Sequence, residues 1–373
     1  MKVLYFTRGF SPHDRRFLES LAGTNHQIEY LPLLAGPSQG ALKKLPDEVS
    51  GHPAVINRHS LGWHQYPAAT ARFSERLGQI QPDLVHAGPI HLSAAISALA
   101  GYHPLVSMSW GSDLLWEARK PWVILLARYT LKRSDAFVGD CQAVKHAAVR
   151  LGMDAERVVL FPWGTDLEHY SPGSGEWLRQ ELGWQDQFVL ISTRTFEPLY
   201  GVDVIVKAFM QAAKRHRELR LLLLGEGSQR SLFEKWLAEA GFADRAHFVG
   251  TIGKERLPDY YRAADLYLSA SHSDGSSVSL LEAMACGLPA LVSDIPGNRE
   301  WVEPGVNGWW FESGEIDSLV AGIQRAIENR DRLDDIGQAG RHVVEDRADW
   351  ENNFPRLLEA YSLAARRRGI GDA

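Results

Sequence analysis

The sequence is poor in cysteine, in long apolar runs and in charge of one sign. Its 373 residues include two cysteines, Cys141 and Cys286, which lie far apart and lack metal-ligand spacing. This scarcity excludes a disulfide framework and favours a reducing, cytoplasmic setting. The apolar run at the N-terminus is too short for a signal peptide, and no run of about 18 apolar residues predicts a membrane-spanning helix. The formal net charge of −6 leaves no nucleic-acid footprint, so we expect no nucleic-acid partner.

The G-x-G-x-x-G fingerprint of dinucleotide-binding enzymes is also missing. The first apolar run is followed by TRGFSPHDRRF, which has one glycine. Leu224 is followed by GEGSQR, in which Arg230 stands at the place of the third glycine. Neither stretch qualifies, so the sequence argues against a nicotinamide-dependent dehydrogenase.

Short apolar runs alternate with helical stretches along the chain. The expected strands are Val3–Phe6, Ile28–Leu31, Leu84–His86, Leu105–Met108, Ala136–Val138, Val158–Phe161, Phe188–Ser192, Leu221–Leu224, His247–Val249, Leu266–Leu268 and Ala290–Val292. This alternation predicts an α/β protein with parallel sheets covered by helices on both faces. Two sets of strands predict two doubly wound, Rossmann-like domains at residues 1–165 and 166–348, followed by a C-terminal helix within 349–373.

The segment 269–296, SASHSDGSSVSLLEAMACGLPALVSDIP, predicts a strand, a polar loop, a helix and a strand. Asp274 and Glu282 flank the turn Gly275-Ser276-Ser277. The first N–H groups of the helix, around Ser276 to Val278, lack intrahelical partners, and the helix dipole favours an anion there. A carboxylate such as Glu282, set among apolar residues, needs partners, and two sugar hydroxyls suit it. The segment predicts a phosphate seat beside a hydroxyl clamp; an ordinary helix with a surface Asp and a solvated Glu is the alternative.

This segment resembles the E-x7-E donor-site motif of glycosyltransferase family 4, a retaining family with the GT-B fold, and reads D-x7-E here. The resemblance implies two Rossmann-like domains facing across a cleft, the first binding the acceptor and the second the nucleotide sugar. It also implies that the C-terminal helix crosses back to the first domain. In the family the second acid holds the ribose hydroxyls, the intervening amides hold the diphosphate, and the first acid lies near the donor sugar. These roles fall on Glu282, on Gly275 to Val278, and on Asp274.

The resemblance further assigns the donor diphosphate to Arg194, whose planar fork suits phosphate. Arg194, Asp274 and Glu282 are thus the predicted catalytic residues. The implied reaction is front-face transfer, in which the leaving diphosphate takes the acceptor proton. We expect no metal and no other cofactor, because no carboxylate cluster has metal-ligand spacing.

Three donor-side positions depart from the family pattern or stay open. Tyr200 stands where the family has a lysine, and tyrosine supplies no charge. His13, with Asp14, replaces a Gly-Gly pair, and either donates to phosphate or belongs to a helix cap. Gly225 and Gly227 resemble the family's G-x-G turn beside the nucleotide, but a tight turn between strand and helix explains them equally well.

The predicted acceptor site consists of His86, Trp110 and Asp113. DLVHAGP resembles the family's P-D-x-V-H-x-H stretch, with Gly88 in place of the second histidine. In SMSWGSDLL, Trp110 stands where the family often has a catalytic-site histidine. Trp110 can stack on a sugar face. Asp113 either accepts sugar hydroxyls or caps a helix.

Residues 114–133 mix tryptophan, aliphatic side chains and Lys/Arg. They predict either an internal cover helix or, as in many relatives, contact with the inner face of a membrane. The predicted partners are a nucleotide-sugar donor and a carbohydrate or lipid-linked acceptor. Two other functions remain open: a non-catalytic sugar-nucleotide-binding subunit, favoured by Tyr200 and Trp110, and a GT-B epimerase or phosphorylase, which needs a further acid/base or a cofactor lysine.

Overall fold

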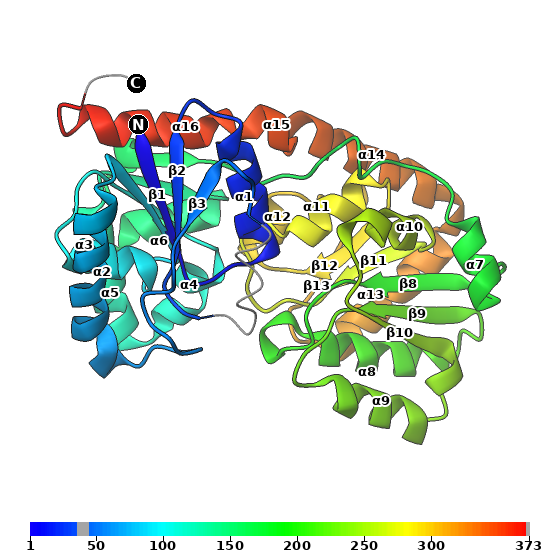
Figure 1. Ribbon diagram of the computed structural model, residues 1–373. Helices are drawn as coiled ribbons and strands as arrows, with labels where there is room; N and C mark the ends of the chain where they lie inside the picture. Colours follow the sequence, from blue (N-terminus) through cyan, green and yellow to red (C-terminus); the bar gives the residue numbers. More distant parts are fainter. Residues whose placement is uncertain (36–44, 371–373) are drawn as a thin grey trace. The chain divides into compact units, whose positions relative to one another are not determined.

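The computed structural model describes residues 1–35 and 45–370, which form two compact units. The first unit consists of Met1–Phe161 together with Phe354–Ala373, and the second is Pro162–Asn353. Figure 1 follows the chain through both units by colour. The first unit is therefore built from two stretches that are far apart in sequence.

The first unit contains a parallel sheet with the strand order β3-β2-β1-β4-β5-β6-β7. Neighbouring strands pair in register, as Val3 with Ile28 on one side of β1 and with Leu84 on the other. The strands are β1 (Lys2–Thr7), β2 (Gln27–Pro32), β3 (Val49–Gly51), β4 (Leu84–Gly88), β5 (Leu105–Met108), β6 (Ala136–Gly139) and β7 (Val158–Leu160).

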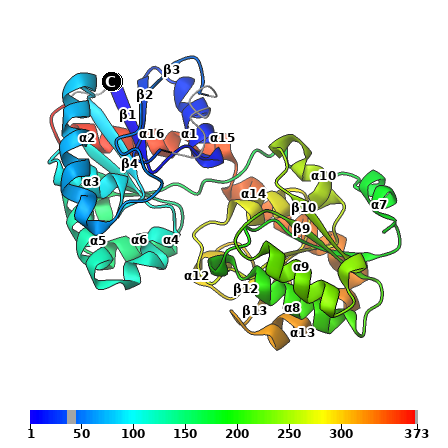
Figure 2. The same cartoon turned by 60° about the horizontal axis from the view of Figure 1, so that its bottom comes forward.

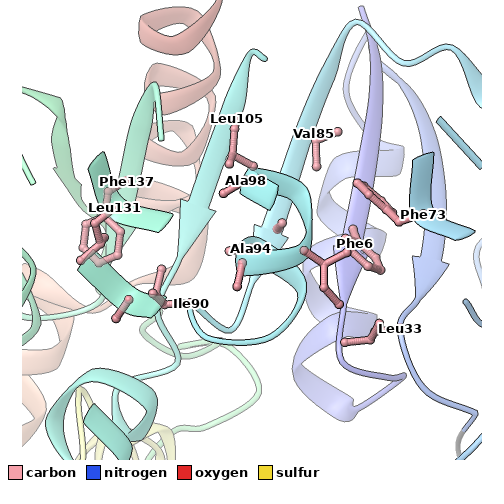
Figure 3. Packing of buried hydrophobic residues seen from close by; sticks show 14 of the residues in the cluster. Phe6, Leu33, Phe73, Val85, Ile90, Ala94, Ala98, Leu105, Leu131 and Phe137 are labelled. Atoms are coloured by element: carbon pink, nitrogen blue, oxygen red, sulfur yellow. The ribbon is translucent and has the colours of Figure 1, made fainter. Parts of the chain in front are cut away.

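Helices cover both faces of this sheet, because its strands are apolar on both sides. One face packs against α2, α3, α5 and α6, and Figure 3 shows Phe6, Val85 and Leu105 of the sheet beside Phe73 and Leu131 of the helices. The other face packs against α1 and α16, where Tyr5 stacks on Phe17. The helices are α1 (Pro12–Ala22), α2 (Tyr66–Ile80), α3 (Ser93–Leu99), α4 (Ser112–Leu115), α5 (Pro121–Arg133), α6 (Gln142–Arg150) and α16 (Pro355–Arg366), with 3-10 turns at Trp63–Gln65, Glu117–Arg119 and Ala155–Arg157.

The second unit repeats the design with the strand order β10-β9-β8-β11-β12-β13, again all parallel. The strands are β8 (Phe188–Ser192), β9 (Leu219–Leu224), β10 (Ala246–Gly250), β11 (Leu266–Ser269), β12 (Ala290–Ser293) and β13 (Gly308–Phe311). Figure 2 shows this sheet and its helices after a rotation of 60° about the horizontal axis.

Two separate apolar clusters lie on the two faces of the second sheet. Helices α8, α9 and α13 cover one face, and α10, α11 and α14 cover the other. The helices are α7 (Glu176–Leu182), α8 (Val202–Ala213), α9 (Arg230–Glu239), α10 (Leu257–Arg262), α11 (Val278–Ala285), α12 (Pro296–Arg299), α13 (Ile316–Glu328), α14 (Leu333–Arg347) and α15 (Trp350–Asn353), with 3-10 turns at Pro198–Tyr200, Ala243–Arg245, Lys254–Arg256 and Arg330–Arg332.

The α/β class and both parallel sheets are confirmed, and every expected strand is present. Two strands of the described ranges escaped prediction. β3 has only three residues at a sheet edge, and β13, GWWF, carries its aromatic residues without an aliphatic run or alternation. In the described ranges, no helix has the length and apolarity needed to cross a bilayer.

Candidate functional site

The second sheet reverses its winding between the neighbouring strands β8 and β11. Ligands of open parallel sheets bind beyond the carboxyl ends of strands at such a reversal. The loops after these two strands contact each other there, because His272 N donates to Leu199 O at 2.9 Å. Gly201 has φ +61°, and a β-carbon on it would collide with the Ala270 carbonyl oxygen. Only glycine allows the two loops to approach this closely.

Arg194 lies at the centre of the contact between the loops. Its Nη2 donates to Asp274 Oδ2 at 2.6 Å. Its Nη1 donates to the hydroxyls of Ser277 and Ser279 at 2.8 and 2.9 Å. One side chain from the β8 loop therefore organises the whole start of α11. The sequence predicted Arg194 and Asp274 as site residues, but gave no sign that they form an ion pair.

The guanidinium of Arg194 stays charged although it is almost fully buried. Burial lowers its pKa, but the Asp274 carboxylate and then the surrounding tyrosines raise it by more, so the pKa lies above its usual value. The ring of Tyr200 lies 4.4 Å from the guanidinium carbon, which gives a cation–π contact. Within the described part of the chain, Arg194 Nε is buried and has no hydrogen-bond partner. Tyr200, at the place of the family lysine, therefore supports the cation beside it.

The N-terminus of α11 presents backbone amides without a side-chain cap. Ser277 is the N-cap residue, yet its side chain makes no capping bond and accepts from Arg194 instead. Ser276 is held from the other side, where Trp301 Nε1 donates to its hydroxyl at 3.2 Å. Gly275 N donates to Asp274 Oδ1 at 3.1 Å. The loop is thus fixed by side chains, and the amides from Ser276 to Val278 keep their place at the positive end of the helix.

Glu282 lies one turn further along α11 and is half-buried. Tyr261 Oη donates to Glu282 Oε2 at 3.0 Å. Sequence reasoning missed Tyr261, Ser279 and Trp301, all of which hold site residues in place. Their stretches read as apolar helix and loop, and only the fold brings them to the site.

Gly225 and Gly227 follow β9 and pack against the backbone that carries Arg194. A β-carbon on Gly225 would lie 2.7 Å from Arg194 O, and one on Gly227 would lie 2.5 Å from Phe196 O. Phe196 N donates to Glu226 O at 3.0 Å, which locks the turn in place. Close packing explains both glycines, so they shape the loop of Arg194 whether or not they touch a nucleotide.

Two predicted acceptor residues are buried inside the first unit. His86 is fully buried, its Nδ1 lies 2.8 Å from Tyr361 Oη, and burial lowers its pKa to about 3. The Asp113 carboxylate accepts from the amides of Ile90 and Trp110 and from the Ser109 hydroxyl, at 2.8, 3.0 and 2.6 Å. These contacts favour the capping role for Asp113 and an internal role for His86.

Trp110 and His13 come together in the first unit. Their ring centroids are 6.0 Å apart in an edge-to-face arrangement. A β-carbon on Gly88 would lie 2.8 Å from Trp110 Nε1, so the glycine and the tryptophan at the two family histidine positions depend on each other. The neighbouring Asp14 closes a capping box with Ser11 at the start of α1, while His13 makes no part of it.

The cluster around Arg194 combines a buried cation, oriented amides and a held carboxylate. Such a set can bind a phosphate at the amides beside Arg194, whose charge Asp274 balances in part, and can accept hydrogen bonds from hydroxyls at Glu282. Residues 1–35 and 45–370 include no group of three or more His, Cys, Asp or Glu side chains placed to hold a metal ion.

Two family models match the chain. The model described as "Glycosyltransferase Family 4" matches residues 9–169, and the model described as "Glycosyl transferases group 1" matches residues 176–343. The chain is 27% identical over 392 residues to D-inositol 3-phosphate glycosyltransferase of Nocardia farcinica, covering 100% of this chain and 84% of that protein. It is 22% identical over 388 residues to the GDP-mannose-dependent alpha-(1-6)-phosphatidylinositol monomannoside mannosyltransferase of Mycolicibacterium smegmatis, covering 96% and 98%.

Solved structures show the same architecture. Anabaena HepE in complex with UDP-glucose matches with a TM-score of 0.82 at 20% identity, covering 97% of this chain and 99% of that one. Sucrose-phosphate synthase from Thermosynechococcus elongatus matches with a TM-score of 0.80 at 18% identity, covering 97% and 98%. At these identities the likeness speaks for the fold, two parallel-sheet units of the GT-B type.

Proposed function

Because the chain belongs to glycosyltransferase family 4, we propose that it moves a sugar from a nucleoside-diphosphate sugar to a hydroxyl of a carbohydrate or lipid-linked acceptor, with retention. Glycosyl transfer itself follows from the family. We propose, beyond the family's activity, that the donor is a nucleoside-diphosphate sugar, that the anomeric configuration is retained, and that the acceptor is a hydroxyl of a carbohydrate or lipid-linked molecule. Relatives support the donor class, since one is named for GDP-mannose and another was solved with UDP-glucose.

One observation carries the proposal: Arg194 binds the first turn of α11 at the reversal of the second sheet. In this proposal the donor diphosphate occupies the amides of Ser276 to Val278, next to the buried cation. Nη1 and Nη2 of Arg194 bond to the loop, and Nε is buried. In this proposal Arg194 therefore acts on the diphosphate through its charge and through the start of α11 that it holds. Glu282 then accepts the ribose hydroxyls.

The proposed chemistry is a front-face displacement. The bond between the anomeric carbon and the diphosphate oxygen breaks while the acceptor oxygen bonds to the same face of the sugar. The departing diphosphate takes the acceptor proton. Arg194 and the α11 amides stabilise the negative charge that grows on the leaving oxygen, and binding orients the two substrates. No side chain of the protein becomes covalently attached.

Charge neutralisation by Arg194 and α11 makes metal-independent transfer part of the proposal. Chelation of divalent cations should therefore leave the rate unchanged. The experiment compares nucleoside diphosphate release before and after treatment with EDTA, and then with added Mg²⁺ or Mn²⁺. Loss of activity on chelation and recovery with the ion would contradict this part.

A panel of nucleotide sugars tests the donor. A bound donor raises the melting temperature by mass action, and the stabilising donor should then release nucleoside diphosphate slowly without an acceptor. Stabilisation by no member of the panel would overturn the proposal. Binding without any release would point to a non-catalytic sugar-nucleotide-binding role.

We also propose that the first unit contacts a membrane through residues 114–133 and their neighbours. Trp63, Leu99, Trp122, Leu125 and Tyr129 line one apolar cavity of about 380 Å³, and each is at least 40% exposed. Residues 114–133 contain five Lys or Arg and one acidic residue, Glu117. Exposed aromatic rings within a cationic surround suit an anionic lipid surface. α5 thus covers the sheet through Val123 and Ala127. It also exposes Trp122, Leu125 and Tyr129, which we call the apolar ridge.

Vesicle sedimentation tests the membrane proposal. Binding to phosphatidylglycerol vesicles should exceed binding to neutral phosphatidylcholine vesicles, and should fall with salt. The double variant Trp122→Ser/Leu125→Ser should lose most of it, and Arg128→Glu/Lys132→Glu should lose the salt-sensitive part. Trp177→Ser, which removes a 42% exposed tryptophan of the second unit, is the matched control. Dimerisation of the wild type with no vesicle binding would assign the ridge to a second copy instead.

A further inference from the structure

Tyr261 holds Glu282 by a hydrogen bond within the second unit. It lies on α10, is fully buried, and reaches the site from beneath α11. Its hydroxyl lies 3.0 Å from Glu282 Oε2, 3.0 Å from Thr193 Oγ1 and 3.3 Å from the Ser279 carbonyl oxygen. One oxygen atom therefore joins the end of β8 to two positions of α11.

The number of protons decides the direction of these bonds. Burial first, and then the charge of Glu282, raises the pKa of Tyr261 well above its usual value, so the phenol keeps its single proton. A tyrosine hydroxyl can donate one hydrogen bond, and a carboxylate can only accept. The bond to a charged acceptor is the stronger choice. Tyr261 therefore donates to Glu282, and Thr193 donates to the Tyr261 oxygen.

We infer that Tyr261 is a positioning residue that orients the Glu282 carboxylate toward the vicinal hydroxyls of the donor ribose. This inference rests on the proposed function, which assigns those hydroxyls to Glu282. Each carboxylate oxygen can accept two hydrogen bonds, so the bond from Tyr261 fixes the plane of the group and leaves it able to accept from a ligand. Thr193 precedes Arg194, so the same contact couples the orientation of Glu282 to the strand end that carries the phosphate-binding cation.

Without the tyrosine hydroxyl, Glu282 would keep its charge but lose the bond from α10 that helps to orient it. The predicted consequence is a loss of selectivity for ribose over 2′-deoxyribose. A role in folding alone would weaken both nucleotides equally, because it would disturb the whole start of α11. The ratio of the two affinities therefore separates positioning from general support.

The experiment measures the dissociation constants of UDP, GDP and their 2′-deoxy forms by calorimetry. For whichever ribonucleotide binds the wild type, Tyr261→Phe should weaken binding about tenfold, the size of one lost charge-assisted hydrogen bond. The affinity for its 2′-deoxy form should fall by less, because only one of the two hydroxyls remains to depend on Glu282. The double variant Tyr261→Phe/Glu282→Gln should show the same ratio of ribose to deoxyribose affinities as Glu282→Gln alone, because the hydroxyl affects ribose recognition through the carboxylate.

Tyr267→Phe is the matched control. It removes another buried hydroxyl beneath α11, one that lies 2.9 Å from Ser279 Oγ. This variant should keep the wild-type ratio between ribose and deoxyribose affinities. A ratio of ribose to deoxyribose affinity that is unchanged in Tyr261→Phe would overturn the positioning role, whether both affinities fall equally or neither falls. The variant Glu282→Gln tests the proposed function by itself. If it keeps the preference for ribose over 2′-deoxyribose, the assignment of the ribose to Glu282 is wrong, whatever Tyr261→Phe does.

Discussion

At the scale of single residues, Glu282 gives the sharpest test of the donor site. Glu282→Gln keeps the shape and an oxygen for Tyr261 but removes the charge that strengthens bonds from hydroxyls. Because charged hydrogen bonds contribute about 1.5–3 kcal/mol each, we expect nucleoside diphosphate binding to weaken by about 2 kcal/mol, while the melting temperature changes little. Titration calorimetry measures the first and a thermal scan the second. An unchanged dissociation constant would remove Glu282 from the site.

Arg194 is a structural residue as well as a proposed phosphate ligand. Its ion pair with Asp274 is only 10% and 18% exposed at the two side chains. Removing one partner of such a pair leaves a charge behind, which costs about 3 kcal/mol. We expect Arg194→Ala to lose about this much stability in urea unfolding, together with nucleoside diphosphate binding.

The double variant Arg194→Ala/Asp274→Asn separates the two roles. Neutralising Asp274 removes the stranded charge, so stability should recover in part, whereas nucleotide binding should stay lost because the cation is absent. Recovery of binding would show that another group holds the phosphates. Both carboxylate oxygens of Asp274 have partners in the loop, Arg194 and Gly275. These contacts give Asp274 a part in holding the phosphate seat, and its predicted contact with the donor sugar stays a prediction.

At the scale of elements, the start of α1 should make stability depend on pH. Burial raises the pKa of Asp14 from 3.8 to about 6, against the hydrogen bonds from Ser11 and its neighbours. A carboxyl with a raised folded-state pKa stabilises the fold fully below its unfolded pKa and loses that contribution as pH rises through about 6. A rise of this size in the pKa corresponds to about 3 kcal/mol of unfolding free energy.

The variant Asp14→Asn cannot titrate, so it isolates this contribution. Between pH 4 and pH 8 the wild type should lose about 2 kcal/mol of unfolding free energy relative to the variant, because at pH 4 the carboxyl of the unfolded chain has already begun to ionise. Denaturation in urea at several pH values measures the difference. Asp154→Asn, at an exposed cap of the same unit, is the control and should run parallel to the wild type. If the unfolding free energies of the wild type and Asp14→Asn change with pH in the same way, ionisation of Asp14 does not destabilise the fold.

Apolar runs in the sequence predicted most strands, but not the edge strand β13 or the partners of Asp113. The runs of Phe188–Ser192 and Leu105–Met108 matched their strands to the residue, because both faces of a buried parallel strand must be apolar. β13 escaped because a sheet edge accepts two tryptophans from a loop-like sequence. The partners of Asp113 escaped as well, since a cap and a ligand-binding carboxylate look alike until their neighbours are known.

At the scale of the whole molecule, α16 belongs to the first unit although it follows the second in the chain. Its Leu357, Ala360, Tyr361 and Ala364 are fully buried, and it packs on β5, β6 and β7. Ending the chain at Asn353 should destabilise the first unit by several kcal/mol, because one buried large side chain alone contributes about 2–5 kcal/mol. Nucleoside diphosphate should still raise the unfolding temperature of the second unit.

Calorimetry of this truncated chain should resolve an early transition for the first unit. Truncation after Arg368 is the control, because it keeps all of α16 and the ion pair of Arg368 with Asp135. A single transition at the wild-type temperature in the chain ending at Asn353 would show that α16 contributes little.

The sequence by itself determined the α/β class and the eleven expected strands, and it predicted a phosphate seat and a hydroxyl clamp at residues 274–282. These follow from local rules, because apolar runs, small-residue turns and helix starts act within a few residues of themselves. Only the tertiary structure decided how the donor-site residues are held. Arg194 meets Asp274, and Tyr261 meets Glu282, across 80 and 21 positions of the chain. Such contacts depend on the order of strands in the sheet, which no local pattern specifies, so the support of the site became visible only in the fold.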